Sequence, residues 1–131
     1  MITERFERWQ PLENTPRRLE IRALRDEDEG LCVVVASEET RKPLMKLVFQ
    51  DFVAYRNVNE SFRIRTWQSH VMKGSSSLLI VHGSLWLDWL RQESGGVLDD
   101  VGLTHYAIYT NDDCIDVAAR VAPLVLALDS P

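Results

Sequence analysis

The chain has 131 residues, of which 45% are hydrophobic and 27% charged, and its formal net charge is −5. This composition predicts one globular domain over residues 1–131 and excludes disorder, collagen-like order and coiled coils. A chain of this mass buries enough surface to fold without a metal or a disulfide. The longest apolar runs, such as residues 31–36, are far shorter than the roughly 20 residues of a membrane helix, so no membrane contact is expected.

The negative charge is unevenly distributed. Residues 1–66 carry 12 basic and 12 acidic side chains, whereas residues 67–131 carry 3 basic and 8 acidic ones. An acidic surface disfavours nucleic acid and steers basic proteins, although it also serves solubility alone. The candidate partner-binding residues are four aspartates in predicted loops, Asp99, Asp100, Asp112 and Asp113.

The N-terminal residues 1–9 are charged throughout and lack the apolar core of a secretory signal. Cys32 and Cys114 lie in apolar segments without the spacing of a zinc or redox motif. We therefore expect buried thiols in a cytoplasmic protein. His70, His82 and His105 have no metal-ligand spacing, which favours structural roles, but a catalytic triad assembled across the fold stays open.

Residues 1–18, with Pro11 and Pro16, predict an irregular N-terminal arm. Alternation over residues 19–23 and an apolar run over 31–36 predict two strands, paired as a hairpin across the acidic turn of residues 26–30. That turn resembles the start of a calcium loop, but its glycine comes one position early and Ser37 stands at the last ligand position.

Residues 44–57 read as extended, with a bulge or tight bend at Gln50–Asp51 where the alternation slips. Residues 52–57 and 62–67 alternate on either side of a four-residue loop, which predicts a second hairpin. A symmetric register places Arg56, Arg63 and Arg65 on one face of this hairpin. The opposite, apolar face would then hold Val53, Tyr55, Phe62 and Ile64.

Like charges on facing strand positions repel, so the three arginines need compensation. Glu60, an acidic strand or a bound anion would supply it, and a solvated face with internal salt bridges is the alternative. Arg56, Arg63 and Arg65 are therefore the candidate residues of an anion-binding cleft.

Residues 73–77 form a Gly/Ser loop that lacks the order of a phosphate-binding motif. A short strand over 78–81 precedes a helix over 84–94, which Ser84 caps and Gly95–Gly96 ends. Trp86 and Trp89 fall at helical spacing, where core packing is favoured over a ligand platform.

Residues 105–110 and 114–118 predict two strands around the turn 111–113, with a helix over 114–122 as the alternative, and a last apolar segment covers 124–128. The carboxylates Asp112, Asp113 and Asp116 fit a turn better than a metal site. The elements together predict an α+β fold, a curved, mostly antiparallel sheet of hairpins packed on one main helix.

Two segments, 49–56 followed by Glu60 and 105–117, resemble small bacterial α+β proteins that accompany secreted toxins as immunity proteins. The resemblance implies a non-enzymatic, cytoplasmic binding protein without a cofactor, and a basic protein partner, because many such toxins are basic nucleases. These families share no catalytic motif, so the resemblance assigns no site residue. The competing hypothesis is a small-ligand-binding protein or enzyme that uses the arginine-lined cleft for an anionic group.

Overall fold

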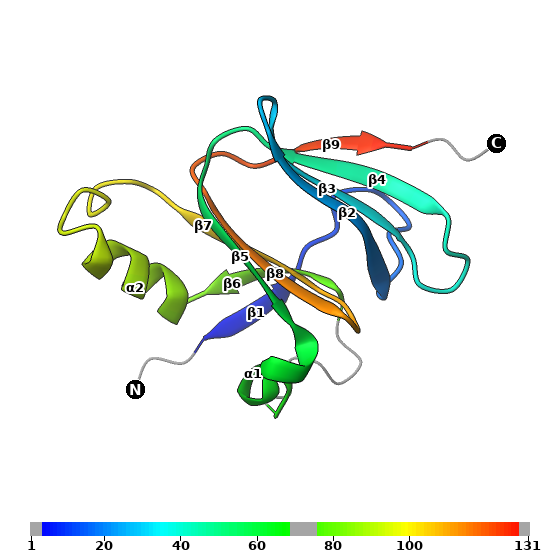
Figure 1. Ribbon diagram of the computed structural model, residues 1–131, viewed down its shortest axis with the longest axis horizontal. Coiled ribbons are helices and arrows are strands. Elements are labelled where there is room, and N and C mark those ends of the chain that lie inside the picture. Colours follow the sequence, from blue (N-terminus) through cyan, green and yellow to red (C-terminus); the bar gives the residue numbers. More distant parts are fainter. Residues whose placement is uncertain (1–3, 69–75, 129–131) are drawn as a thin grey trace.

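The computed structural model describes residues 4–68 and 76–128, and they form two antiparallel sheets (Figure 1). The five-stranded sheet has the order β1 (Arg5–Arg8), β6 (Leu78–His82), β7 (Thr104–Tyr109), β8 (Asp113–Ala119) and β5 (Phe52–Asn59). The four-stranded sheet has the order β2 (Leu19–Glu27), β3 (Gly30–Ser37), β4 (Pro43–Phe49) and β9 (Leu124–Ala127). The helical elements are a 3₁₀ turn, η1 (Glu60–Phe62), and two α-helices, α1 (Ile64–Gln68) and α2 (Leu85–Glu93).

The mostly antiparallel strand arrangement of the predicted α+β fold is confirmed, but the structure has two sheets in place of one curved sheet. Neither of the described α-helices has the length and apolarity to cross a membrane.

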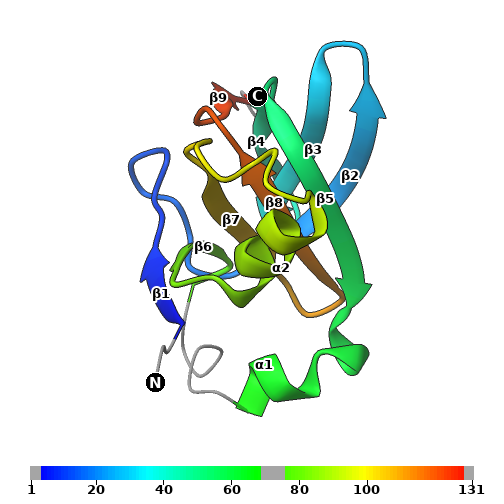
Figure 2. The same ribbon diagram turned by 90° about the vertical axis from the view of Figure 1, so that its left-hand side faces the viewer.

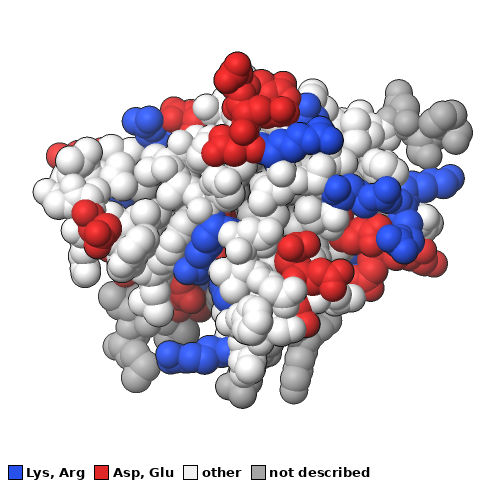
Figure 3. All heavy atoms as spheres, viewed as in Figure 1, with Lys and Arg blue, Asp and Glu red and all other residues white. Residues whose placement is uncertain are grey.

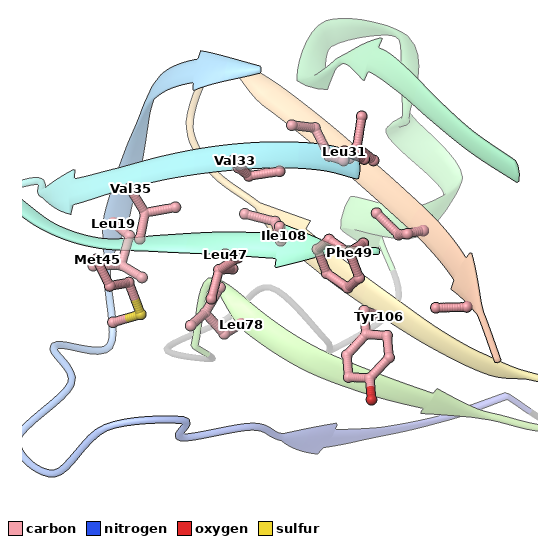
Figure 4. Close-up of a cluster of buried hydrophobic side chains, with 13 residues drawn as sticks. Leu19, Leu31, Val33, Val35, Met45, Leu47, Phe49, Leu78, Tyr106 and Ile108 are labelled. Atoms are coloured by element: carbon pink, nitrogen blue, oxygen red, sulfur yellow. The ribbon is translucent and has the colours of Figure 1, made fainter. Parts of the chain in front are cut away.

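The main hydrophobic core lies between the two sheets (Figure 4). Side chains from β2, β3 and β4 point toward side chains from β6 and β7, with Phe49 edge-on to Tyr106 at 5.4 Å between ring centroids. Alternate residues of β8, such as Ile115 and Val117, complete this core. Because strand side chains alternate, the other residues of β7 and β8 must face away from the core.

The predicted β2–β3 hairpin is confirmed, with Glu27 paired to Gly30 across the acidic turn. Gly30 has a φ of +129°, and a Cβ at this position would lie 2.5 Å from the carbonyl oxygen of Phe49. Only glycine fits this close approach of β3 to the end of β4.

The bend predicted at Gln50–Asp51 is also confirmed, and it has a larger consequence than a bulge. The chain leaves the four-stranded sheet after β4 and enters the five-stranded sheet as β5. Arg120 holds this crossing, because its backbone N–H donates to the Asp51 carbonyl at 3.0 Å and its Nε donates to the Asp51 carboxylate at 2.9 Å.

The predicted second hairpin is wrong. β5 pairs with β8, and residues 62–67 belong to η1 and α1 except for Arg63, which lies between them. Phe62 and Ile64 are 80% and 59% exposed, so the expected apolar face does not form.

Asn59 explains why residues 60–62 form a helical turn, because its side chain accepts from the Ser61 backbone N–H at 2.9 Å. Alternation over six residues does not select a pairing partner, and β8 supplies a longer one.

The N-terminal arm is less irregular than predicted, since β1 pairs with β6 and Trp9 packs against Tyr106. Residues 114–118 are strand and not helix, and the last apolar segment is β9, paired with β4. Residues 73–75 of the predicted loop 73–77, and His70, lie outside the described residues.

Candidate functional site

A polar cluster lies on the face of the five-stranded sheet that points away from the core. His105 and Tyr109 of β7 and Asp116 of β8 alternate with core residues and are nearly fully buried. Trp86 and Leu87 of α2 cluster with Ala118 of β8 beside them, and the Trp86 ring lies 5.1 Å from the His105 ring (Figure 2). Ser84 begins this helix as predicted, and its side chain accepts from the Leu87 backbone N–H.

Asp116 is the centre of the cluster and is completely buried. One of its carboxylate oxygens accepts from His105 Nε2 at 2.7 Å and from the Tyr109 hydroxyl. The other oxygen accepts from Arg56 Nε at 2.8 Å and from Arg63 Nη1 at 2.9 Å. Every acceptor position of the carboxylate is thus occupied, which satisfies the requirement that a buried charge be paired and hydrogen-bonded.

Burial alone raises the pKa of Asp116, but the hydrogen bond and charge of His105, with the charges of Arg56 and Arg63, lower it well below the ordinary range. Burial and the neighbouring carboxylate raise the pKa of Tyr109, so its hydroxyl stays protonated and donates to Asp116. The cluster is therefore a fixed ionic centre at neutral pH.

Ser84, His105 and Asp116 form a hydrogen-bonded chain of the residue types found in a catalytic triad. Ser84 Oγ lies 2.7 Å from His105 Nδ1, and the opposite ring nitrogen faces Asp116. Ser84 is only 5% exposed and its oxygen already caps α2, while Asp116 shares its charge with two arginines. We therefore interpret the chain as a structural link from β8 to the start of α2, since a nucleophile must reach its substrate.

A cleft opens beside this cluster, between α2 and β5, and encloses about 720 Å³. It is called the α2–β5 cleft below. Its lining combines the aromatic residues Tyr55, Trp86 and Trp89, the aliphatic residues Ala54, Leu85 and Leu90, the arginines Arg56 and Arg63, and Glu4 and Thr66. A pocket of this size with mostly apolar walls and few charged groups has the form of a small-molecule site.

The structure brings two of the three predicted arginines together and leaves the third apart. Arg56 and Arg63 line the cleft and meet on Asp116, so the compensating carboxylate comes from an acidic strand residue and not from Glu60. Arg65 is exposed and does not line the cleft. Trp86 and Trp89 were both predicted to pack in the core. Trp86 is buried, but Trp89 is 53% exposed.

The four predicted aspartates form two pairs, one before and one after β7. The exposed Asp99–Asp100 pair precedes β7, and the Asp112–Asp113 pair follows it. The strand between the two pairs has six residues and is roughly 20 Å long. In Figure 3 acidic atoms gather most densely over the turn between β2 and β3, in the half of the sequence whose charges balance. Asp113 accepts from Asn57 Nδ2 at 3.3 Å, and the carboxylates of the turn and of Asp116 are not a convergent ligand group among the described residues.

Sequence reasoning missed Asp116 as the centre of the site. The available signal was its position, a charged residue within the apolar run Cys114–Ala118, where it alternates with two core side chains. A buried charge in a strand requires partners, and the arginines already singled out for their own need of compensation were candidates for that role.

Among the described residues one group has the composition of a metal site, Glu27, Glu29 and Cys32 at the β2–β3 turn. Lys46 Nζ already donates to Glu29 at 2.7 Å, and its hydrogen bond is the main cause of the lowered pKa of Glu29. Burial, with the nearby Glu29, raises the pKa of Cys32 to about 11, so the thiol stays protonated. This group is an ion pair beside a thiol and is a poor ligand set for a cation.

No protein-family model matches the chain, and neither a curated protein sequence nor a solved structure is similar to it. The function must therefore be argued from the site itself.

Proposed function

We propose that the protein is a binding module that takes its ligand in the α2–β5 cleft. The observation that carries this proposal is the cleft of about 720 Å³, in which aromatic side chains adjoin two arginines. Trp89 and Leu85 are 53% and 58% exposed at its edge, and apolar side chains left uncovered beside a charged pocket mark binding sites.

The buried cluster supports binding because it holds the cleft in one shape. Asp116 fixes Arg56 and Arg63, and the Arg56 guanidinium lies over the Trp86 ring at 4.9 Å from the centroid. A site whose side chains are already ordered loses less conformational entropy when a ligand binds.

The test is a fragment screen read by NMR, with a library of neutral, anionic and cationic aromatic compounds. The indole N–H signals of the four tryptophans report where each fragment binds. We expect the hits to shift Trp86 and Trp89 together and Trp9, which packs in the core between the sheets, not at all.

Two variants supply the control. Trp89→Ala removes an exposed aromatic wall of the cleft and should weaken the hits about tenfold. Leu126→Ala removes a similarly exposed apolar side chain from β9 on the other sheet and should leave them unchanged. Hits that shift the Trp9 signal, or that survive Trp89→Ala, would contradict the proposal.

The basic-partner hypothesis stays a prediction. The four aspartates on which this hypothesis rests lie in two pairs at the two ends of β7, so each pair needs its own test.

A further inference from the structure

We infer that the ligand of the α2–β5 cleft is a small aromatic compound with one carboxylate, which Arg56 binds. The inference rests on the proposed function, and it adds the chemical class of the ligand.

The two arginines of the cleft differ in their free hydrogen-bond donors. Arg63 is 13% exposed and donates through all three nitrogens, to Thr66, Asp116 and Tyr109. Arg56 is 38% exposed and donates to Asp116 through Nε, and its two Nη groups make no hydrogen bond to the described residues. Arg56 therefore offers a planar pair of N–H groups to the cleft, the geometry that a carboxylate accepts in bidentate form.

The position of Arg56 is fixed before any ligand binds. Its Nε is held 2.8 Å from the Asp116 carboxylate, and its guanidinium lies on the Trp86 ring. The carboxylate of Asp116 is saturated by its four donors, so it does not compete for the Nη groups. An anion bound there would replace water only.

The second acidic residue at the cleft limits the charge of the ligand. Glu4 lines the cleft and accepts from the Leu85 backbone N–H at 2.9 Å. Arg63 is paired with Asp116, so Arg56 is the arginine with N–H groups open to the ligand, and a second negative charge on the ligand would face the Glu4 carboxylate. This arrangement favours a carboxylate over a phosphate.

The remaining walls select an aromatic body. Tyr55, Trp86 and Trp89 line the cleft beside Leu85 and Leu90, and flat rings pack well on such side chains. The cleft volume of about 720 Å³ suits a molecule of one or two rings better than a protein surface.

The experiment titrates the protein with 1-naphthoate, its neutral isostere 1-naphthamide and the dianion 1-naphthyl phosphate, and follows the Trp86 and Trp89 indole signals. We expect 1-naphthoate to bind at least about tenfold more tightly than the amide, because a charge-assisted bidentate pair adds to the same ring contacts. The phosphate should bind more weakly than the carboxylate.

Three variants assign the effect to residues. Arg56→Gln should remove the preference for 1-naphthoate over the amide, and Arg65→Gln, an exposed arginine outside the cleft, should retain it. Arg63 and His105 still hold Asp116 in Arg56→Gln, so the fold should persist. Glu4→Gln should improve binding of the phosphate relative to the carboxylate.

The comparison of the three ligands on the unmodified protein decides the inference even if a variant fails to fold. Equal binding of amide and carboxylate at Trp86 and Trp89 would overturn the carboxylate and leave the binding module standing. Tighter binding of the phosphate would overturn the charge argument. Absence of any shift by 1-naphthoate would also overturn the inference. The proposed function is decided separately by the fragment screen: it fails if no ligand of any charge binds in the cleft, or if the hits shift Trp9 or survive Trp89→Ala.

Discussion

Replacing Asp116 with asparagine tests whether the buried ionic cluster stabilises the fold. Asn keeps the shape of the side chain but removes the charge that faces Arg63, which is only 13% exposed, and it turns an N–H group toward donors that need an acceptor. Removing one partner of a buried ion pair costs about 3–5 kcal/mol. The pair with Arg56 adds at most about 1 kcal/mol, because that side chain is 38% exposed and screened by solvent.

Urea unfolding followed by tryptophan fluorescence measures the effect. With an m-value of about 2 kcal/mol/M, the midpoint should fall by roughly 1.5–3 M in Asp116→Asn, with the slope unchanged. Asp113→Asn is the matched control, since this half-buried carboxylate accepts one long hydrogen bond from Asn57, and its cost should stay below about 1 kcal/mol.

The same pair of proteins should respond differently to acid. The pKa of Asp116 in the folded state lies below its unfolded value of about 3.9, so the unfolded chain binds the proton first as pH falls. The stability that Asp116 contributes is therefore complete above about pH 5 and declines as pH falls below about 4. The gap between wild type and Asp116→Asn should narrow in that range. A gap under 1 kcal/mol at pH 7, or one that grows in acid, would refute the reasoning.

The remaining predictions concern the thiols and the acidic loops. Burial is the main cause that raises the pKa of both Cys32 and Cys114 to about 11, so about 0.1% of each thiol is thiolate at pH 8. Labelling of the native protein by a thiol reagent should therefore be at least a hundredfold slower than labelling in urea. Labelling of Cys32 at the unfolded rate would place its strand at the surface. If a basic protein partner exists, one of two variants should associate with it more slowly and with a weaker salt dependence: Asn at Asp99 and Asp100, or Asn at Asp112 and Asp113. The other variant should associate like the wild type, because the two pairs lie at opposite ends of β7. Stopped-flow association rates against ionic strength measure this, and unchanged rates for both variants would remove the charge argument for such a partner.

The sequence predicted those elements whose signal is local. The hairpin of β2 and β3 has its turn residues and its apolar run in one stretch of chain, and α2 has both a capping serine and terminal glycines. The bend at Gln50–Asp51 was visible because it interrupts the alternation. Each of these features depends on neighbours within a few residues, where backbone preferences act.

The pairing of β5 with β8 depends on residues about 60 positions apart and has no local signal. Two of the three predicted arginines meet, but not through the predicted hairpin, since Arg56 faces Asp116 across β5 and β8 and Arg63 reaches the same carboxylate from the segment before α1. The cleft could not be predicted from the sequence either, because the helix α2 was predicted but its position beside β5 was not.

The position of Asp116 joins the stability of the fold to the shape of the cleft. From one carboxylate, hydrogen bonds lead to Arg56 on β5, to Arg63 before α1, and through His105 to Ser84 at the start of α2. These three elements contribute most of the residues that line the cleft. A protein that needed only a stable outer face could cover β7 and β8 with apolar side chains, since well-packed apolar replacements of buried ion pairs are often as stable. The ionic centre adds a fixed arginine whose donors remain open to the cleft, and an oriented cation of this kind is what the proposed binding site requires.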